Sequence, residues 1–254
     1  MINPIREKYQ CAKSLNAWAG RITIASSILE LLAFILSKLD YSAFSCAIKG
    51  LDCMCGTAII FIALLSASCT IVHLGSESER RKMAIDNAYE KSFACGKSVK
   101  YYNNDDTKKG LQRLAYNVFE SCFFTNAIVN IMLKRTRIMA WLLMLPFLAA
   151  IFMRELNFFM QMCSLGIVTM ILSEWLRLEV LEYRTRNILQ NFRTHYSTKS
   201  KKDKTFNDII LQMMVLDYEA ALSWSHILLS ENIYERDNAS LSKKWEEIKS
   251  IYNI

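Results

Sequence analysis

The sequence contains few of the residues that interrupt helices. Its 254 residues include 2 prolines and 7 glycines, and segments in which apolar and polar residues alternate are scarce. Proline removes a helix hydrogen bond and glycine raises the entropic cost of a helix, so their rarity favours long helices. The lack of alternation is atypical of half-buried strands. We therefore predict an all-α protein.

Signatures of catalysis are also missing. The chain contains no G-x-x-x-x-G-K-[ST], H-E-x-x-H, G-x-S-x-G or C-x-x-C motif, and its 3 histidines are far apart. Among its 8 cysteines, Cys53 and Cys55 form a C-x-C pair inside an apolar segment, and the others are scattered. We predict no enzyme activity, no cofactor and no metal. The thiols are interpreted as small buried apolar groups, with a disulfide or metal site as the alternative.

One segment without charge dominates the first third of the chain. Residues 53–74, CMCGTAIIFIALLSASCTIVHL, include no Asp, Glu, Lys or Arg. As a helix this segment extends about 33 Å, close to the hydrocarbon thickness of a bilayer. It lies too far from the N-terminus to be a cleavable signal peptide. We predict that it is a transmembrane helix.

Three further segments have the length and composition of spans. They are residues 18–39, with Trp18 as an interfacial anchor, residues 138–153, which include Pro146, and residues 156–175. Pro146 is expected to kink its helix. The last two segments are predicted to form a hairpin of short spans, because one unbroken helix would be about 54 Å long. The predicted fold is an all-α membrane protein with four transmembrane helices, cytoplasmic helical extensions and a C-terminal helical segment.

The spans divide the chain into four predicted domains. Residues 1–75 form the N-terminal segment and first transmembrane hairpin, and residues 76–137 form a cytoplasmic helical insert. Residues 138–175 form the second hairpin. Residues 176–254 form a cytoplasmic helical stalk with C-terminal helices.

Local signals refine the first half of this scheme. Residues 37–52 are predicted to be a short connection between the first two spans, and the second helix is predicted to continue into water as far as residues 95–96. Asn, Asp and Gly mark residues 97–110 as a loop. Residues 111–133 are predicted to form a helix, either at the membrane surface or packed under the bundle.

A heptad-like stripe follows the fourth span. Its members recur at alternating steps of three and four residues: Ile171, Glu174, Leu178, Leu181, Thr185, Ile188 and Phe192. The stripe is predicted either to pack against other helices of the same subunit or to join subunits in a coiled coil. Residues 197–204 are interpreted as a basic linker, and helices are predicted over residues 206–229 and 241–252.

The distribution of basic residues predicts the topology. With four spans, all of the 31 lysines and arginines except Lys38, Lys49 and Arg154 lie on one side of the membrane. The positive-inside rule then places that side, and both termini, in the cytoplasm.

One acid lies inside a predicted span. Glu30 is near the middle of residues 18–39, and Ser26 and Ser27 are one turn away. A carboxylate at this depth costs about 2.5–3.5 kcal/mol on insertion scales, so it is expected to avoid lipid. Glu30 is either protonated and hydrogen-bonded within the bundle or exposed to water in a pore. Glu30, Ser26 and Ser27 are the candidate pore or gate residues.

Basic residues gather around the predicted cytoplasmic loop, and the net charge of the chain is +7. Such clusters bind phosphates, and Tyr101 and Tyr102 are suited to stacking on bases. The alternative is that these charges only fix the topology and contact anionic lipid. The candidate ligands for an anion are Lys97, Lys100, Tyr101, Tyr102, Lys108, Lys109 and Arg113.

Two short sequences and the overall layout indicate a family. Residues 100–105 read KYYNND and residues 117–125 read NVFESCFFT. With two spans, a cytoplasmic insert, two more spans and a cytoplasmic tail, the region over residues 17–195 resembles the SLATT-like, four-transmembrane pore-forming effectors of bacterial anti-phage defence, which include the membrane effector of the Hailong system. The resemblance implies an oligomeric pore or ion channel in the bacterial inner membrane. It also implies control by a nucleotide or oligonucleotide signal from a partner enzyme.

A second class of function competes with the pore. A non-channel membrane adaptor would use the same spans as an anchor and its cytoplasmic helices to dock a partner. A small transporter is disfavoured because no repeat relates the two halves of the sequence. For the pore we expect a closed homo-oligomeric ring of four subunits, because identical subunits usually assemble with closed symmetry.

Overall fold

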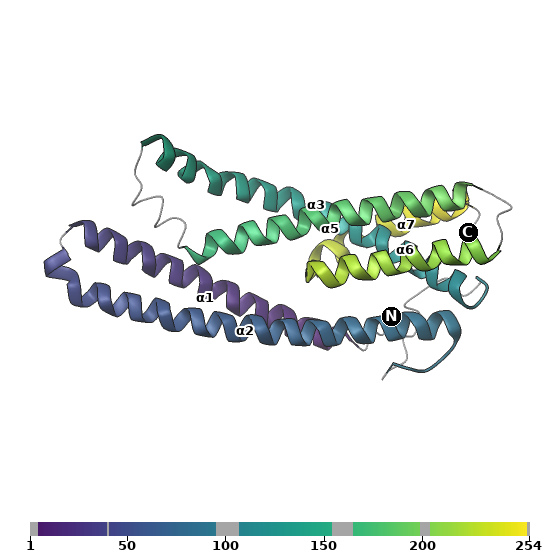
Figure 1. Ribbon diagram of the computed structural model, residues 1–254, viewed down its shortest axis with the longest axis horizontal. Coiled ribbons are helices and arrows are strands. Elements are labelled where there is room, and N and C mark those ends of the chain that lie inside the picture. Colours follow the sequence, from purple (N-terminus) through teal and green to yellow (C-terminus); the bar gives the residue numbers. More distant parts are fainter. Residues whose placement is uncertain (1–4, 40, 95–106, 154–164, 199–203, 253–254) are drawn as a thin grey trace. The chain divides into compact units, whose positions relative to one another are not determined.

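The computed structural model describes residues 5–39, 41–94, 107–153, 165–198 and 204–252. This part of the chain is helical and contains no strand, which confirms the all-α prediction. Its six helices, shown in Figure 1, are α1 (Arg6–Leu39), α2 (Tyr41–Tyr89), α3 (Leu111–Met153), α5 (Gly166–Ser197), α6 (Lys204–Ser225) and α7 (Glu231–Tyr252). α2 alone has 49 residues, as expected where helix-breaking residues are rare.

The first two helices correct two predicted boundaries. The predicted connection over residues 37–52 is mostly helical, because α1 continues to Leu39 and α2 begins at Tyr41. α2 ends at Tyr89 rather than near residues 95–96. Glu90 adopts a φ of 53°, and the carboxylate of Asp86 accepts hydrogen bonds from the backbone N–H groups of Phe93 and Ala94 at 2.8–2.9 Å. These bonds turn the chain away from the helix axis before the glycine that was expected to stop it.

α3 joins two segments that were predicted separately. The expected surface helix over residues 111–133 and the expected span over residues 138–153 form one helix of 43 residues. The basic residues between them are good helix formers, so the change from polar to apolar sequence does not interrupt the backbone. Pro146 lies inside this helix, which continues to Met153. The start of the predicted fourth span lies outside the described residues, and α5 begins at Gly166.

The two C-terminal helices also differ from their predicted bounds. α6 ends at Ser225, before the predicted residue 229, because His226 adopts a φ of 48°. α7 begins at Glu231 rather than at residue 241. The side-chain oxygen of Ser230 accepts a hydrogen bond from the N–H of Ile233 at 3.5 Å, which is the N-cap arrangement favoured for serine.

The chain forms two compact units. The apolar unit consists of Lys8–His73 and Arg135–Leu176, and the bundle unit consists of Met1–Glu7, Leu74–Lys134 and Arg177–Ile254. Helices α2, α3 and α5 each contribute residues to both units.

Small side chains bring α1 and α2 together in the apolar unit. The two helices run side by side in Figure 1, and every buried residue of α1 is Ala, Ser or Thr. The thiol of Cys69 donates to the carbonyl oxygen of Ala12 at 3.3 Å, and that of Cys55 donates to the carbonyl oxygen of Ser26 at 3.6 Å. Small residues allow this close approach of two backbones, as they do between helices in membranes.

Large apolar side chains cover the outside of this hairpin. Ile59, Ile60, Phe61 and Leu64 of α2 are 60–61% exposed. Among the described residues, α1 and the part of α2 from Ser42 onward are long and apolar enough to cross a membrane, and only 22% and 11% of their most apolar windows are buried. A core helix of a soluble protein would bury most of such a window. These helices include the predicted spans over residues 18–39 and 53–74.

Aromatic rings fill the core of the bundle unit. Phe119 of α3 stacks on Phe192 of α5 with ring centroids 4.9 Å apart, and meets Trp245 of α7 edge to face at 5.0 Å. Tyr196 of α5 also stacks on Phe119, at 5.7 Å. Since each large buried ring contributes strongly to stability, this cluster holds α3, α5 and α7 together.

The heptad-like stripe of α5 lies in the same core. Leu178, Leu181, Thr185, Ile188 and Phe192 are all less than 5% exposed within a single chain. The thiol of Cys122 and the amide nitrogen of Asn126, both on α3, donate to the carbonyl and side-chain oxygens of Thr185, respectively. The interpretation that these residues pack within the subunit is therefore confirmed.

Polar contacts attach α6 to the bundle unit. Arg80 of α2 pairs with Glu77 at 2.9 Å and with Glu219 of α6 at 2.5 Å, and the three side chains are 12–17% exposed. The hydroxyl groups of Tyr218 on α6 and Thr125 on α3 are 3.0 Å apart. These contacts pair the polar side chains that α6 buries against α2 and α3, as is usual for buried polar groups.

Tyr196 and Tyr218 offer a matched test of this core. Burial raises the pKa of both phenols well above the ordinary value. The Tyr218 hydroxyl is hydrogen-bonded to Thr125, whereas the buried hydroxyl of Tyr196 has no hydrogen-bond partner in the described part of the chain. At neutral pH, Tyr218→Phe is expected to lower the unfolding free energy by about 1 kcal/mol, and Tyr196→Phe to leave it unchanged or raise it. Thermal unfolding of the purified protein in detergent measures both changes.

The same two variants have a predicted alkaline phenotype. Because the folded-state pKa is raised, the unfolded phenol ionises first, at about pH 10, and stability falls as the pH rises from there toward the folded-state pKa. Each Tyr→Phe variant should therefore lose less stability than the wild type above pH 10. Tyr183→Phe, which alters an exposed ring, is the control and should match the wild type. Equal alkaline losses in all four proteins would contradict the assignment.

Candidate functional site

The apolar unit contains the three residues predicted to line a pore or gate. Ser26 and Ser27 are 5% and 3% exposed. The Ser26 hydroxyl donates to the carbonyl oxygen of Thr23 at 3.0 Å, and the Ser27 oxygen accepts a hydrogen bond from the N–H of Ile167 at 3.1 Å. Within one chain, both serines are thus packing groups of α1, and Ser27 fixes the start of α5.

Glu30 follows the two serines on α1. Its side chain is partly exposed, and its Oε2 atom is buried without a hydrogen-bond partner among the described residues. An unpaired carboxylate oxygen in apolar surroundings is unfavourable. It is stable as the protonated acid, or with water or another subunit as the missing partner. Glu30 is therefore the member of this set whose environment is incomplete in a single described chain.

The predicted anion site is described only in part. Lys97, Lys100, Tyr101 and Tyr102 lie outside the described residues, whereas Lys108 and Lys109 are exposed at the N-terminal side of α3. Lys109 pairs with Glu90, and the hydrogen bond from Lys109 is the main reason that the pKa of Glu90 is lowered.

The side chain of Arg113 is buried and makes structural contacts instead of facing solvent. Its side chain is 6% exposed. The guanidinium donates to the carbonyl oxygen of Thr107 at 2.8 and 3.1 Å and to that of Asn87 at 3.3 Å. Nearby, Gly110 has a φ of 109° and its N–H donates to the carbonyl oxygen of Ala88 at 2.8 Å. Arg113 and Gly110 therefore hold the end of α2 against the start of α3.

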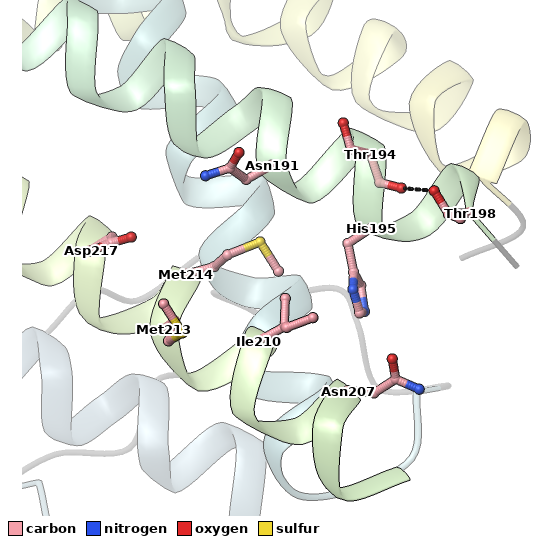
Figure 2. Close-up of a pocket in the computed structure, with 9 residues that line it drawn as sticks. All are labelled: Asn191, Thr194, His195, Thr198, Asn207, Ile210, Met213, Met214 and Asp217. Carbon is pink, nitrogen blue, oxygen red and sulfur yellow. Dashed lines mark hydrogen bonds between the residues drawn. The ribbon is translucent and has the colours of Figure 1, made fainter. Parts of the chain in front are cut away.

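The structure also has a pocket that the sequence did not indicate. It lies between α5 and α6 in the bundle unit and has a volume of about 300 Å³. Figure 2 shows His195 of α5 pointing toward Asn207 of α6. The lining residues are Asn191, Thr194, His195, Thr198, Asn207, Ile210, Met213, Met214 and Asp217.

The pocket combines hydrogen-bonding groups with an apolar wall. Amide, hydroxyl, imidazole and carboxylate groups line it, together with one Ile and two Met side chains. The lining is thus mixed, and no ligand class follows from it. Among the described residues there is no group of three or more His, Cys, Asp or Glu side chains placed to hold a metal ion. The polar residues of α5 recur at helical spacing in the sequence, but the pairing of α5 with α6 that makes them a pocket has no sequence signature.

Comparison with known proteins identifies no relative. No protein-family model, no curated protein and no solved structure matches the chain. The similarity to SLATT-like effectors therefore stays a prediction, and function has to be inferred from the residues described above.

Arg113 and Lys108 are predicted to have separable roles. Arg113→Ala removes a nearly buried guanidinium with three hydrogen bonds, and is expected to lower the unfolding free energy by about 2–3 kcal/mol. Lys108→Ala changes an exposed side chain and should leave the melting temperature unchanged. Thermal unfolding of the two variants in detergent compares them directly. Equal melting temperatures would remove the structural role given to Arg113.

Proposed function

We propose that this chain is a subunit of an oligomeric membrane pore or ion channel, with four transmembrane helices and both termini in the cytoplasm. The observation on which the proposal depends is the α1–α2 hairpin. Its outer face is apolar and exposed, and a carboxyl group without a described partner lies within it. The two features together favour a conducting assembly over a simple anchor.

Membrane insertion explains the exposed surface of the hairpin. In water, contiguous side chains such as Ile59, Ile60, Phe61 and Leu64 would form an aggregation-prone patch, whereas lipid solvates them. Residues 138–153 extend the same apolar character, since Ile138, Trp141, Leu142 and Leu145 are also 59–66% exposed. With residues 156–175 they make the proposed second hairpin.

The polar parts of the chain suit the cytoplasmic side. The bundle unit has boundaries at Glu7, Leu74, Lys134 and Arg177, and the last three fall within a few residues of the proposed spans. It contains most of the lysines and arginines, as the positive-inside rule requires of a cytoplasmic region.

Glu30 favours a pore over the adaptor. An anchor for a cytoplasmic scaffold gains nothing from an acid inside the hydrocarbon layer, and the acid costs free energy on insertion. In a ring of subunits, one acid from each copy can face a water-filled axis and attract cations. A protonated Glu30 that serves only packing is the competing interpretation.

The proposal includes a biological setting. By its resemblance to SLATT-like proteins, the pore acts in the bacterial inner membrane as an effector of anti-phage defence that impairs the infected cell. An anionic nucleotide or oligonucleotide, made by a partner enzyme, binds the cytoplasmic side. Helices α2, α3 and α5 contribute residues to both units, and we propose that they transmit ligand binding from the bundle unit to the apolar unit.

Cysteine labelling tests the topology. On a cysteine-free background, Ser45→Cys should react with a membrane-impermeant maleimide from outside intact cells. Asp106→Cys and Ser200→Cys should react only after the cells are opened. The reason is that an even number of spans returns the chain to the cytoplasm after each hairpin. External labelling of Ser200→Cys in intact cells would refute four spans with cytoplasmic termini.

Substitution of Glu30 tests the pore. In planar bilayers with a tenfold KCl gradient, Glu30→Gln should move the reversal potential toward zero, because the acids that attract cations are lost. Glu235→Gln, which removes an exposed acid of α7, is the control and should keep the wild-type value. A wild-type reversal potential in Glu30→Gln, with assembly intact, would assign Glu30 to packing. No conductance from an assembled wild-type protein would support the adaptor instead.

A further inference from the structure

Helix α6 has two apolar faces. One is buried in the bundle unit and consists of Leu211, Met214, Tyr218, Ala221 and Ser225. A helix at the surface of a soluble bundle normally presents polar residues on its other side. Here the other side is also apolar and is 47–67% exposed, and its large residues are Phe206, Ile209, Met213, Leu216 and Trp224. We call these five residues the outer face of α6.

The outer face has the spacing of a coiled-coil seam. Phe206, Ile209, Met213 and Leu216 are separated by steps of three, four and three residues, and Ala220, also exposed, continues the series. This is the a/d pattern that lets the side chains of one helix fit between those of a second helix over about two heptads. The inner face follows a separate series, so a partner on the seam would leave the core contacts of α6 unchanged.

The charges of α6 indicate another helix rather than lipid as the partner. Apart from Glu219, which pairs with Arg80 in the bundle unit, the helix includes two acids, Asp208 and Asp217, and one basic residue, Lys204. Helices that lie on anionic bilayers usually place Lys and Arg beside their apolar face. α6 has the opposite charge, so a membrane surface is a poor match.

A second copy of α6 is a good match. In a parallel pair of these helices, the flanking position of Gln212 lies beside Asp217 of the other copy. Glu219, at the next flanking position, is paired with Arg80 of its own subunit and does not face the partner. The amide can donate to the carboxylate, and no two like charges are opposed. The acidic flanks that disfavour lipid are thus compatible with self-association.

We propose that the outer face of α6 binds the same face of α6 in a second copy of the chain, as a short parallel coiled coil. The inference rests on the proposed function in that a pore requires assembly, and it names a contact outside the membrane-spanning helices. A face that pairs with itself joins subunits two at a time with two-fold symmetry, so these cytoplasmic helices pair within the assembly and the number of subunits is even. A tetramer would contain two such pairs.

Disulfide cross-linking locates the contact. On a cysteine-free background of the full-length protein in detergent, Met213→Cys and Leu216→Cys should oxidise to covalent dimers at least tenfold more than Ala239→Cys. The control residue is also exposed, but it belongs to α7 and not to the seam or its flanks. Facing seam positions bring Cα atoms within the roughly 4.4–6.8 Å that a disulfide needs. Equal cross-linking at all three positions would overturn the proposal.

A charge variant tests whether the contact holds subunits together. M213K/L216K changes exposed side chains, so the melting temperature of the variant should stay near that of the wild type. Its detergent-corrected mass by light scattering should fall to half of the wild-type mass or less, while Ala239→Lys, on the exposed side of α7, keeps the full mass. An unchanged mass for M213K/L216K would overturn the α6 contact and leave the proposed pore intact.

Two further results would also overturn the proposed α6 contact. A monomeric wild-type protein would overturn both the α6 contact and the oligomeric pore. If a fluorophore attached through Met213→Cys in lipid nanodiscs is quenched by brominated lipid, the outer face contacts the bilayer instead of a second copy. Dimeric cross-linking without conductance would support the α6 contact and remove the pore.

Discussion

The structure depends on helices that continue from one compact unit into the other. α2, α3 and α5 are long because almost nothing in their sequences interrupts an α-helix, and each supplies residues to both compact units. Except at the helix ends and at Pro146 of α3, the backbone groups of such a helix are hydrogen-bonded to one another whatever surrounds it, which is the condition for entering lipid. The backbone of each helix is therefore the same in both units. Its side chains differ: they are largely exposed and aliphatic in the apolar unit, and they make buried polar and aromatic contacts in the bundle unit.

The two units use different means to hold these helices. In the apolar unit, Ala, Ser, Thr and Cys bring backbones close together, so the contact depends on shape and not on exclusion of water. In the bundle unit, large rings such as Phe119 and Trp245 gain free energy from leaving water, and Arg80 with its two glutamates links helices distant in sequence. This division of chemistry matches the proposal of a lipid-embedded unit and a cytoplasmic one.

Patterns within one helix were predictable, and pairings between helices were not. The uncharged run over residues 53–74 and the periodic stripe from Leu178 to Phe192 are both local patterns, and the structure contains the first as part of α2 and the second as a buried face of α5. In the sequence, Arg113 is one of several basic residues near a loop and was predicted to bind an anion. Its hydrogen bonds to Asn87 and Thr107 depend on how α2 meets α3, and no local pattern predicts that contact. The pocket at His195 was missed for the same reason. The end of α2 at Tyr89 was also missed, because it depends on hydrogen bonds from the backbone of Phe93 and Ala94 to the Asp86 side chain, which no sequence pattern indicates.

The start of α5 limits which residues can replace Gly166. A Cβ atom on Gly166 would lie 3.2 Å from the Cγ2 atom of Thr23 and 4.0 Å from the oxygen of Ser27. The space at residue 166 is thus already occupied by α1, and packed interiors tolerate little added volume. In related chains, a larger residue at 166 should appear together with a smaller one at 23. The two positions, although 143 apart in the chain, would then vary as one unit.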